Sequence, residues 1–184
     1  MELTLKRIRI YLAIFFFLCS CSGKDVTKQV HNDSISKPPF YNDTQNILKT
    51  GLYLVVQQSN TDCIVDTLEK KPDETICIER KPAVTIENFK TVRTYSFEMN
   101  GDTITNLNIR LDNKGTKVFD KFTGNNIGKR IALVINGRAI MAPVVEARIF
   151  SGSITIGSEQ NWTPKELDNL KSIINYELFN RKLR

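Results

Sequence analysis

Residues 111–157 read LDNKGTKVFDKFTGNNIGKRIALVINGRAIMAPVVEARIFSGSITIG, and this stretch decides the fold class. Asp112 is placed to cap a helix that extends to Thr123, because a short carboxylate accepts hydrogen bonds from the free N–H groups of a first helical turn. The expected inner face of this helix consists of Val118, Phe119 and Phe122. Gly124 is expected to end the helix in a left-handed conformation, which glycine adopts readily.

Two Asn-Gly pairs predict tight hairpins, at Asn100-Gly101 and at Asn136-Gly137. Both residues of such a turn adopt positive φ angles, which asparagine and glycine tolerate best. The strands expected around these turns and elsewhere are residues 52–56, 94–99, 103–111, 130–135, 138–141, 144–150 and 153–156. Residues 83–92 are expected to contain a short helical turn.

Cys63 and Cys77 lie in the two arms of a further predicted hairpin, whose residues alternate between apolar and polar. A turn centred on Lys70 would place Cys63 directly opposite Cys77, and Ile64 opposite Ile76. The thiols would then share one face of the hairpin and the isoleucines the other. We expect a disulfide, with two buried free thiols as the alternative.

The C-terminal region predicts a second helix, which begins at a capping box formed by Thr163 and Glu166 with proline at position 164. Its expected buried face consists of Leu167, Leu170, Ile173, Ile174 and Leu178. Strand pairs, a helix, more strands and a final helix predict an α+β fold. We expect a largely antiparallel sheet with helices packed on one face.

The N-terminus has the pattern of a lipoprotein signal peptide, residues 1–20. Its basic residues are Lys6, Arg7 and Arg9. The apolar run at 10–18 is far shorter than the roughly 20 residues that span a bilayer as a helix, but it suits a signal peptide. Leu18 and Ser20 precede Cys21 at the positions expected of a lipid-modified cleavage site. We therefore expect a diacylated Cys21 at the start of the mature chain; the alternative is a short anchor with an incidental cysteine.

Residues 21–46 are polar and lack sustained periodicity, which predicts a flexible tether. An arm packed on the domain around residues 39–41 is the alternative. Residues 47–184 are expected to form one α+β domain. Removal of residues 1–20 takes three basic and one acidic side chain from the 26 and 20 of the full chain and leaves a net charge of +4. This mild charge, without an aromatic-interleaved basic stripe, argues against nucleic-acid binding.

The central stretch resembles the head subdomain in the first periplasmic region (P1) of SecD and SecDF, which assist protein export. The matching residues are 111–119, Thr123, 128–137, 140–145, Ile149 and 152–157. They include a helix with a phenylalanine, a Gly-Lys that leads into an Ile-Ala strand, an Asn-Gly turn and an Ala-Pro. The best match covers residues 82–157, and the helix after Trp162 also fits.

The resemblance implies a non-catalytic α+β head that contacts emerging polypeptide. SecD and SecDF also have membrane-spanning helices whose acidic residues use proton flow. No stretch after the signal peptide in this sequence corresponds to those helices, so the resemblance extends to the head alone.

The sequence argues against an enzyme. His31, its one histidine, lies in the predicted tether, which removes a nucleophile-histidine pair from the domain. No His, Cys or carboxylate cluster has the spacing of metal ligands, and we expect neither metal nor cofactor. The carboxylates that could still meet in space are Glu87, Glu98, Asp120 and Glu146.

We therefore expect a lipid-anchored binding module of the bacterial cell envelope, outside the cytoplasm. Sheet edges can bind extended polypeptide through unpaired backbone groups. The expected partner-binding loop residues are Met141, Pro143, Arg148 and Phe150. Core packing is the alternative for Met141 and Phe150. The rival function is a structural or inhibitory accessory lipoprotein that docks on one folded envelope partner; a hydrolase would need a deep pocket with shifted carboxylates.

Overall fold

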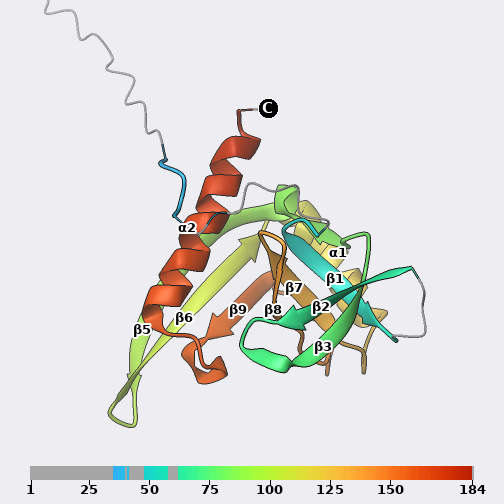
Figure 1. The fold of residues 1–184 in the computed structure, drawn as a ribbon, viewed down its shortest axis with the longest axis horizontal. Coiled ribbons are helices and arrows are strands. Elements are labelled where there is room, and N and C mark those ends of the chain that lie inside the picture. Colours follow the sequence, from blue (N-terminus) through green and yellow to red (C-terminus); the bar gives the residue numbers. More distant parts are fainter. Residues whose placement is uncertain (1–34, 40, 42–47, 58–61, 184) are drawn as a thin grey trace, which may run out of the picture. The chain divides into compact units, whose positions relative to one another are not determined.

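The structure, a computed structural model, describes residues 35–39, 41, 48–57 and 62–183. Its strands form two antiparallel sheets (Figure 1). They are β1 (Gly51–Val56), β2 (Cys63–Leu68), β3 (Lys71–Glu79), β4 (Val84–Thr85), β5 (Phe89–Met99), β6 (Asp102–Leu111), β7 (Ile131–Ile135), β8 (Arg138–Met141) and β9 (Ser153–Gly157). The helices are α1 (Asn113–Gly124) and α2 (Pro164–Arg181), with 3₁₀ turns η1 (Ile86–Asn88) and η2 (Ser158–Gln160). The α+β class and the antiparallel pairing are confirmed; the division into two sheets was not predicted.

The first sheet has the strand order β2-β3-β1-β7-β8, with β4 paired to β1. It curls until its two outer strands meet. The Glu69 N–H donates to the Ala139 carbonyl at 2.9 Å, and the Ala139 N–H donates to Asp66 Oδ2 at 3.1 Å. These contacts occupy backbone groups that an open sheet edge would expose. A small apolar cluster that includes Tyr53 and Ile78 lies within this sheet.

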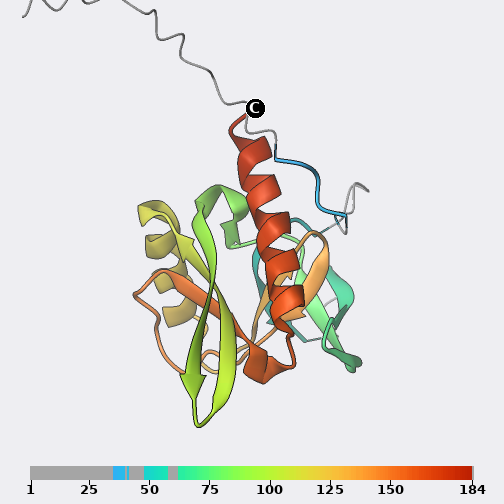
Figure 2. The same cartoon turned by 90° about the vertical axis from the view of Figure 1, so that its left-hand side faces the viewer.

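The second sheet has the order β5-β6-β9, and α2 packs against one of its faces (Figure 2). The main hydrophobic core joins the buried face of α2 to Leu107 and Ile109 of this sheet and to Leu133 and Ile135 of the first sheet. The buried residues of α2 are Leu167, Leu170, Ile173, Ile174 and Leu178, as its sequence predicts. The capping box is also confirmed, since the Thr163 N–H donates to Glu166 Oε2 at 2.9 Å.

Both Asn-Gly hairpins are confirmed. Asn100 and Gly101 have φ angles of 54° and 87°, and Asn136 and Gly137 have 48° and 80°. Met99 pairs with Asp102, and Ile135 pairs with Arg138. Each turn therefore has two residues, both in the left-handed region, which is the geometry that matches the twist of the flanking strands.

The disulfide between Cys63 and Cys77 is present, but the predicted strand register is wrong. Cys63 lies opposite Glu79, and Cys77 lies opposite Val65. The tight turn at residues 69–70 and a bulge near Leu68 move the pairing by two positions. A shift of two keeps every side chain on its predicted face, so the two cysteines still meet across a diagonal.

Two other local expectations are corrected. Gly124 is the last residue of α1 and is followed by a right-handed cap at Asn125, with the positive φ angle at Gly128 instead. In the predicted strand 144–150, Val144 forms one isolated bridge to Arg130, and the rest is loop. The short helical turn expected within residues 83–92 is confirmed as η1, and Phe89 directly after it begins β5. The inner face of α1 is buried at Phe119 and partly buried at Val118 and Phe122.

Candidate functional site

The four loop residues predicted to bind a partner are placed differently by the structure. Met141 is partly buried and packs against the main core, which is the alternative that the sequence left open for this residue. Pro143 and Arg148 are exposed. Phe150 is 67% exposed and does not pack in the core. Pro143, Arg148 and Phe150 therefore remain available to a partner.

Phe150 is held at the surface by its contact with Arg148. The Arg148 guanidinium lies 4.9 Å from the centre of the Phe150 ring and is paired through two nitrogens with the Asp120 carboxylate of α1. The hydrogen bond that Arg148 donates to Asp120 holds the pKa of Asp120 below its usual range. The same hydrogen bond raises the pKa of Arg148. The Ile149 N–H also donates to Thr123 Oγ1 at 3.0 Å. The loop is thus fixed to α1 with an aromatic ring facing solvent.

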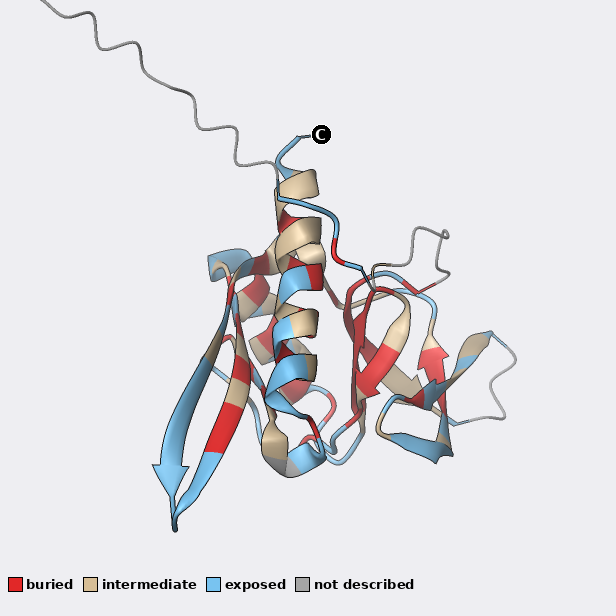
Figure 3. Cartoon of the chain, turned by 60° about the vertical axis from the view of Figure 1, so that its left-hand side comes forward, coloured by how far each residue is buried: buried red, intermediate tan, exposed pale blue. Residues whose placement is uncertain are grey.

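β5 forms an uncovered sheet edge. In the described part of the chain it pairs with β6 and with no second strand. From Tyr95 to Met99 every residue is exposed, and Figure 3 shows this end of the hairpin in pale blue. The hairpin extends past the N-terminal end of α2 (Figure 2). An edge strand of this kind presents free N–H and C=O groups to another chain.

The backbone groups that β5 leaves free follow from the hairpin turn. In a two-residue hairpin the closing pair, here Met99 and Asp102, is hydrogen-bonded, and bonded pairs alternate with non-bonded pairs along the ladder. In β5, the N–H and C=O groups that point away from β6 are therefore those of Thr94, Ser96 and Glu98.

The outer face of β5 carries a row of apolar side chains. Tyr95, Phe97 and Met99 alternate along the strand and are 46%, 41% and 46% exposed. The Tyr95 and Phe97 rings stack with their centres 6.3 Å apart. We call these three residues the β5 row. Sequence reasoning named sheet edges in general and missed this row, although apolar residues at every second position before an Asn-Gly turn mark it.

Basic side chains gather at the other end of the same face. They surround a depression of about 310 Å³ whose lining is Lys90, Thr91, Arg93, Asn108 and Arg110. Asn108 donates to Ser153 Oγ at 2.7 Å and to Thr155 Oγ1 at 3.1 Å, which fixes the floor. The cationic members of this lining are Lys90, Arg93 and Arg110. Among the described residues, none of the three forms an ion pair.

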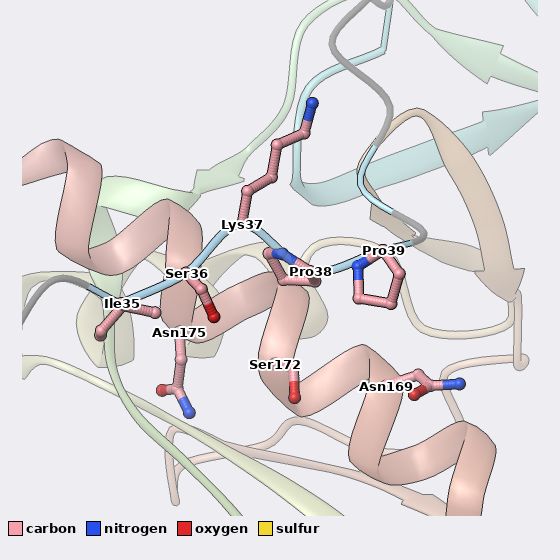
Figure 4. A pocket seen from close by; sticks show the side chains of 8 residues that line it. All are labelled: Ile35, Ser36, Lys37, Pro38, Pro39, Asn169, Ser172 and Asn175. Atoms are coloured by element: carbon pink, nitrogen blue, oxygen red, sulfur yellow. The ribbon is translucent and has the colours of Figure 1, made fainter.

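A second depression, of about 370 Å³, lies between residues 35–39 and α2 (Figure 4). Its α2 side consists of Asn169, Ser172 and Asn175, which share one helix face. Beside it, the rings of Tyr41 and Tyr176 meet edge to face at 4.8 Å. This part of the predicted tether therefore lies against the domain. The rest of the lining is Ile35, Ser36, Lys37, Pro38 and Pro39, so the depression contains no histidine, cysteine or carboxylate.

Three of the four carboxylates that the sequence left able to meet in space have separate partners, and the fourth, Glu146, is exposed. Glu87 lies 3.8 Å from Arg181, Glu98 accepts from Thr103, and Asp120 pairs with Arg148. Within the described residues no three His, Cys, Asp or Glu side chains are arranged to hold a metal ion. No described helix has both the length and the apolar character needed to cross a membrane. His31 and Cys21 lie outside the described residues.

The comparisons with known proteins agree on one family. The family model "SecDF, P1 head subdomain" matches residues 62–176. Protein translocase subunit SecD of Aquifex aeolicus is 30% identical over 102 residues, 55% of this chain and 19% of the relative. SecD of Desulfurispirillum indicum is 40% identical over 53 residues, 29% of this chain and 10% of the relative. The chain thus covers less than a fifth of the length of these relatives.

Two solved structures share the fold. The first, titled "Structure and function of a membrane component SecDF that enhances protein export", superposes with a TM-score of 0.52 at 20% identity and covers 68% of this chain and 61% of its own. The second, SecDF in its super-membrane-facing form, gives 0.53 at 19% identity over 71% of this chain and 19% of its own. The residues that the family model matches extend from the cysteine hairpin into α2 and include strands of both sheets, though not β1. The chain belongs to the SecDF P1 head subdomain family.

Proposed function

We propose that this protein is a non-catalytic, lipid-anchored module of the bacterial cell envelope that binds extended polypeptide along the free edge of β5. The observation that carries this proposal is the contrast between the two sheets. The outer strands of the six-stranded sheet meet at Glu69 and Ala139, whereas β5 has no second neighbour in the described chain. A segment that pairs with β5 gains main-chain hydrogen bonds without regard to its sequence. This suits a head whose relatives take part in protein translocation.

Binding is expected to be weak. Ordering a flexible polypeptide opposes most of the contact free energy, so the expected dissociation constant is nearer micromolar than nanomolar. Neither nucleotide nor metal is expected to change it. The lipid anchor at Cys21 would keep the domain close to the membrane from which polypeptide emerges.

The test uses residues 21–184 with Cys21→Ser, which gives a lipid-free mature chain. A labelled unfolded protein is titrated against it, with the same protein folded as the control. Ser96→Pro removes the outward N–H of one edge residue and leaves the ladder to β6 intact. Ser96→Ala is the matched control, because it loses the same hydroxyl and keeps the N–H. We expect Ser96→Pro to weaken binding at least fivefold and Ser96→Ala to leave it unchanged. Equal affinities for two folded variants would refute binding at this edge.

The anchor has its own test. Cys21→Ala, expressed in a bacterial host, should leave an unprocessed precursor that takes up no labelled fatty acid. Normal acylation of this variant would refute lipidation at Cys21.

The second candidate function is docking on one folded envelope partner. The exposed Phe150 ring, held by Arg148, favours it, because fixed aromatic and arginine side chains often anchor protein interfaces. Phe150→Ser would then abolish capture of one folded protein in intact-cell cross-linking, and Ser96→Pro would not.

A further inference from the structure

We infer that the free edge of β5 selects its segment by side-chain pattern: apolar or aromatic residues at three alternate positions, followed in line by an acidic residue. This inference rests on the proposed function and names the class of polypeptide that the same site prefers. Its basis is the arrangement of the β5 row and the basic end on one face of the sheet.

The alternation follows from strand geometry. A segment added to β5 places every second side chain on the outer face, about 4.5–5.5 Å from the opposing β5 side chain. The opposing side chains at this end of β5 are Tyr95, Phe97 and Met99, all more than two-fifths exposed. Apolar side chains at those positions would cover the β5 row, and polar ones would leave it in water. Residues at the intervening positions face the α2 side, where Thr94, Asp168 and Lys171 form a polar network.

The acidic requirement follows from the charges along the same face. The next outward position beyond Tyr95 is Arg93, and Arg110 and Lys90 lie beside it around the basic depression. Among the described residues of β5, β6 and β9, the acidic side chain on this outer face belongs to Asp102. Asp102 lies opposite Met99, at the turn end of the hairpin. A segment with its acidic residue at the Arg93 end therefore gains an ion pair, and the reversed segment brings that residue close to Asp102.

The length of the pattern is set by the strand. Arg93 and Met99 are six residues apart, or about 20 Å at roughly 3.3 Å per residue. A segment that spans both ends needs seven residues. In an antiparallel arrangement, its N-terminal end lies beside Met99 and its acidic end beside Arg93, as in Phe-Thr-Tyr-Thr-Val-Thr-Glu.

The experiment measures binding of labelled seven-residue peptides to the lipid-free mature chain. The first has the sequence above, the second ends in Lys instead of Glu, and the third has the same composition with its three apolar residues adjacent. We expect the first to bind about tenfold more tightly than the third. We expect a threefold to tenfold preference for Glu over Lys at low salt, which falls as salt is added.

A charge reversal supplies the decisive variant. Arg93→Glu should invert the preference, so that the Lys peptide binds more tightly than the Glu peptide. Phe97→Ser should weaken the first peptide and leave the third unchanged. Arg93 is exposed on an edge strand, so Arg93→Glu is expected to fold, which its circular dichroism spectrum checks.

The outcomes separate this inference from the proposed function. If Ser96→Pro abolishes polypeptide binding while the three peptides bind equally, the edge binds and the pattern inference is overturned. If Arg93→Glu leaves the Glu-to-Lys ratio unchanged, the charge part is overturned. A fourth arm uses vesicles of phosphatidylglycerol and phosphatidylcholine. Vesicle binding that Arg93→Glu abolishes, without any peptide preference, would assign the face to anionic lipid and overturn the inference.

Discussion

Lys70 donates a hydrogen bond of 2.6 Å from its Nζ to Glu166 Oε1. Lys70 lies in the turn between β2 and β3, and Glu166 lies in the first turn of α2, so this ion pair joins the six-stranded sheet to the helix that covers the other sheet. The same ammonium group lies 4.8 Å from the centre of the buried Trp162 ring. Glu166 also completes the capping box with Thr163. One carboxylate thus supports both the start of α2 and a contact between α2 and the six-stranded sheet.

Glu166→Ala is predicted to lower the free energy of unfolding by about 1–1.5 kcal/mol at pH 7, mostly through the lost cap, because an exposed ion pair contributes little. The hydrogen bond from Lys70, followed by those from Thr163, lowers the pKa of Glu166 from 4.5 to about 2. A lowered carboxyl pKa stabilises the folded state above pH 4.5, and this contribution declines as the pH falls toward 2.

Urea denaturation at pH 7 and near pH 2 checks this prediction. The difference between the wild type and Glu166→Ala should shrink at the lower pH. The exposed Glu146, changed to alanine, is the control and should alter stability by less than about 0.5 kcal/mol at either pH. A Glu166→Ala difference that does not change with pH would contradict the role of the charged carboxylate.

Glu177→Gln is predicted to stabilise the protein at neutral pH by about 0.5–2 kcal/mol, the range common for single stabilising changes. Burial raises the pKa of Glu177, and a hydrogen bond with Thr50 opposes that rise. Its charged form is therefore unfavourable in the folded state above the raised pKa, and stability increases as the pH falls through that pKa toward 4.5. Glutamine removes the charge and keeps an acceptor for Thr50.

Thermal denaturation from pH 4 to pH 8 tests this, since the gain should disappear at the acidic end. Glu177→Ala is the contrasting variant. It leaves the buried Thr50 hydroxyl without this acceptor and should destabilise the protein, although Thr50 Oγ1 still accepts from the Asn136 N–H at 2.9 Å. If Glu177→Gln destabilises the protein as much as Glu177→Ala does, the Glu177 carboxylate is stabilising and the prediction is wrong.

Loss of the disulfide is predicted to lower the free energy of unfolding by about 3 kcal/mol, because the bridge closes a short loop in the unfolded chain. Cys63→Ala should account for nearly all of this loss, and the double variant Cys63→Ala/Cys77→Ala should add little. Intact mass before and after reduction and alkylation measures the bridge directly. Two thiols that alkylate in denaturant without prior reduction would show that the purified protein lacks the bridge.

Gly152→Ala is predicted to be more destabilising than Gly128→Ala. Both glycines have positive φ angles, 58° and 81°, so each alanine carries a similar backbone cost of about 1–2 kcal/mol. A Cβ at Gly128 would meet nothing within 4 Å, whereas one at Gly152 would lie 2.1 Å from Thr116 Oγ1 and 2.8 Å from its Cβ. The difference in unfolding free energy isolates the steric contact. Equal losses would show that the loop and α1 separate freely.

Much of the local structure was predictable because its causes lie within a few residues. The Asn-Gly turns need positive φ angles that few other residue pairs tolerate, and Thr163 with Glu166 caps α2 by contacts across one helical turn. The buried face of α2 follows from its 3.6-residue period. The alternating pattern around Cys63 and Cys77 determined which side chains share a face, and hence that the two thiols can meet.

Tertiary contacts decided the rest. The register of the cysteine hairpin depends on where the turn closes, and a shift of two residues is invisible to an alternating pattern. Residues 144–150 have the composition of a strand, yet Arg148 binds Asp120 and Ile149 binds Thr123, so α1 holds them as a loop. The exposure of Tyr95, Phe97 and Met99 also lay beyond the sequence. Apolar residues at alternate positions normally mark a buried face, and it is the packing of α2 on the opposite face of β5 that leaves this row in water.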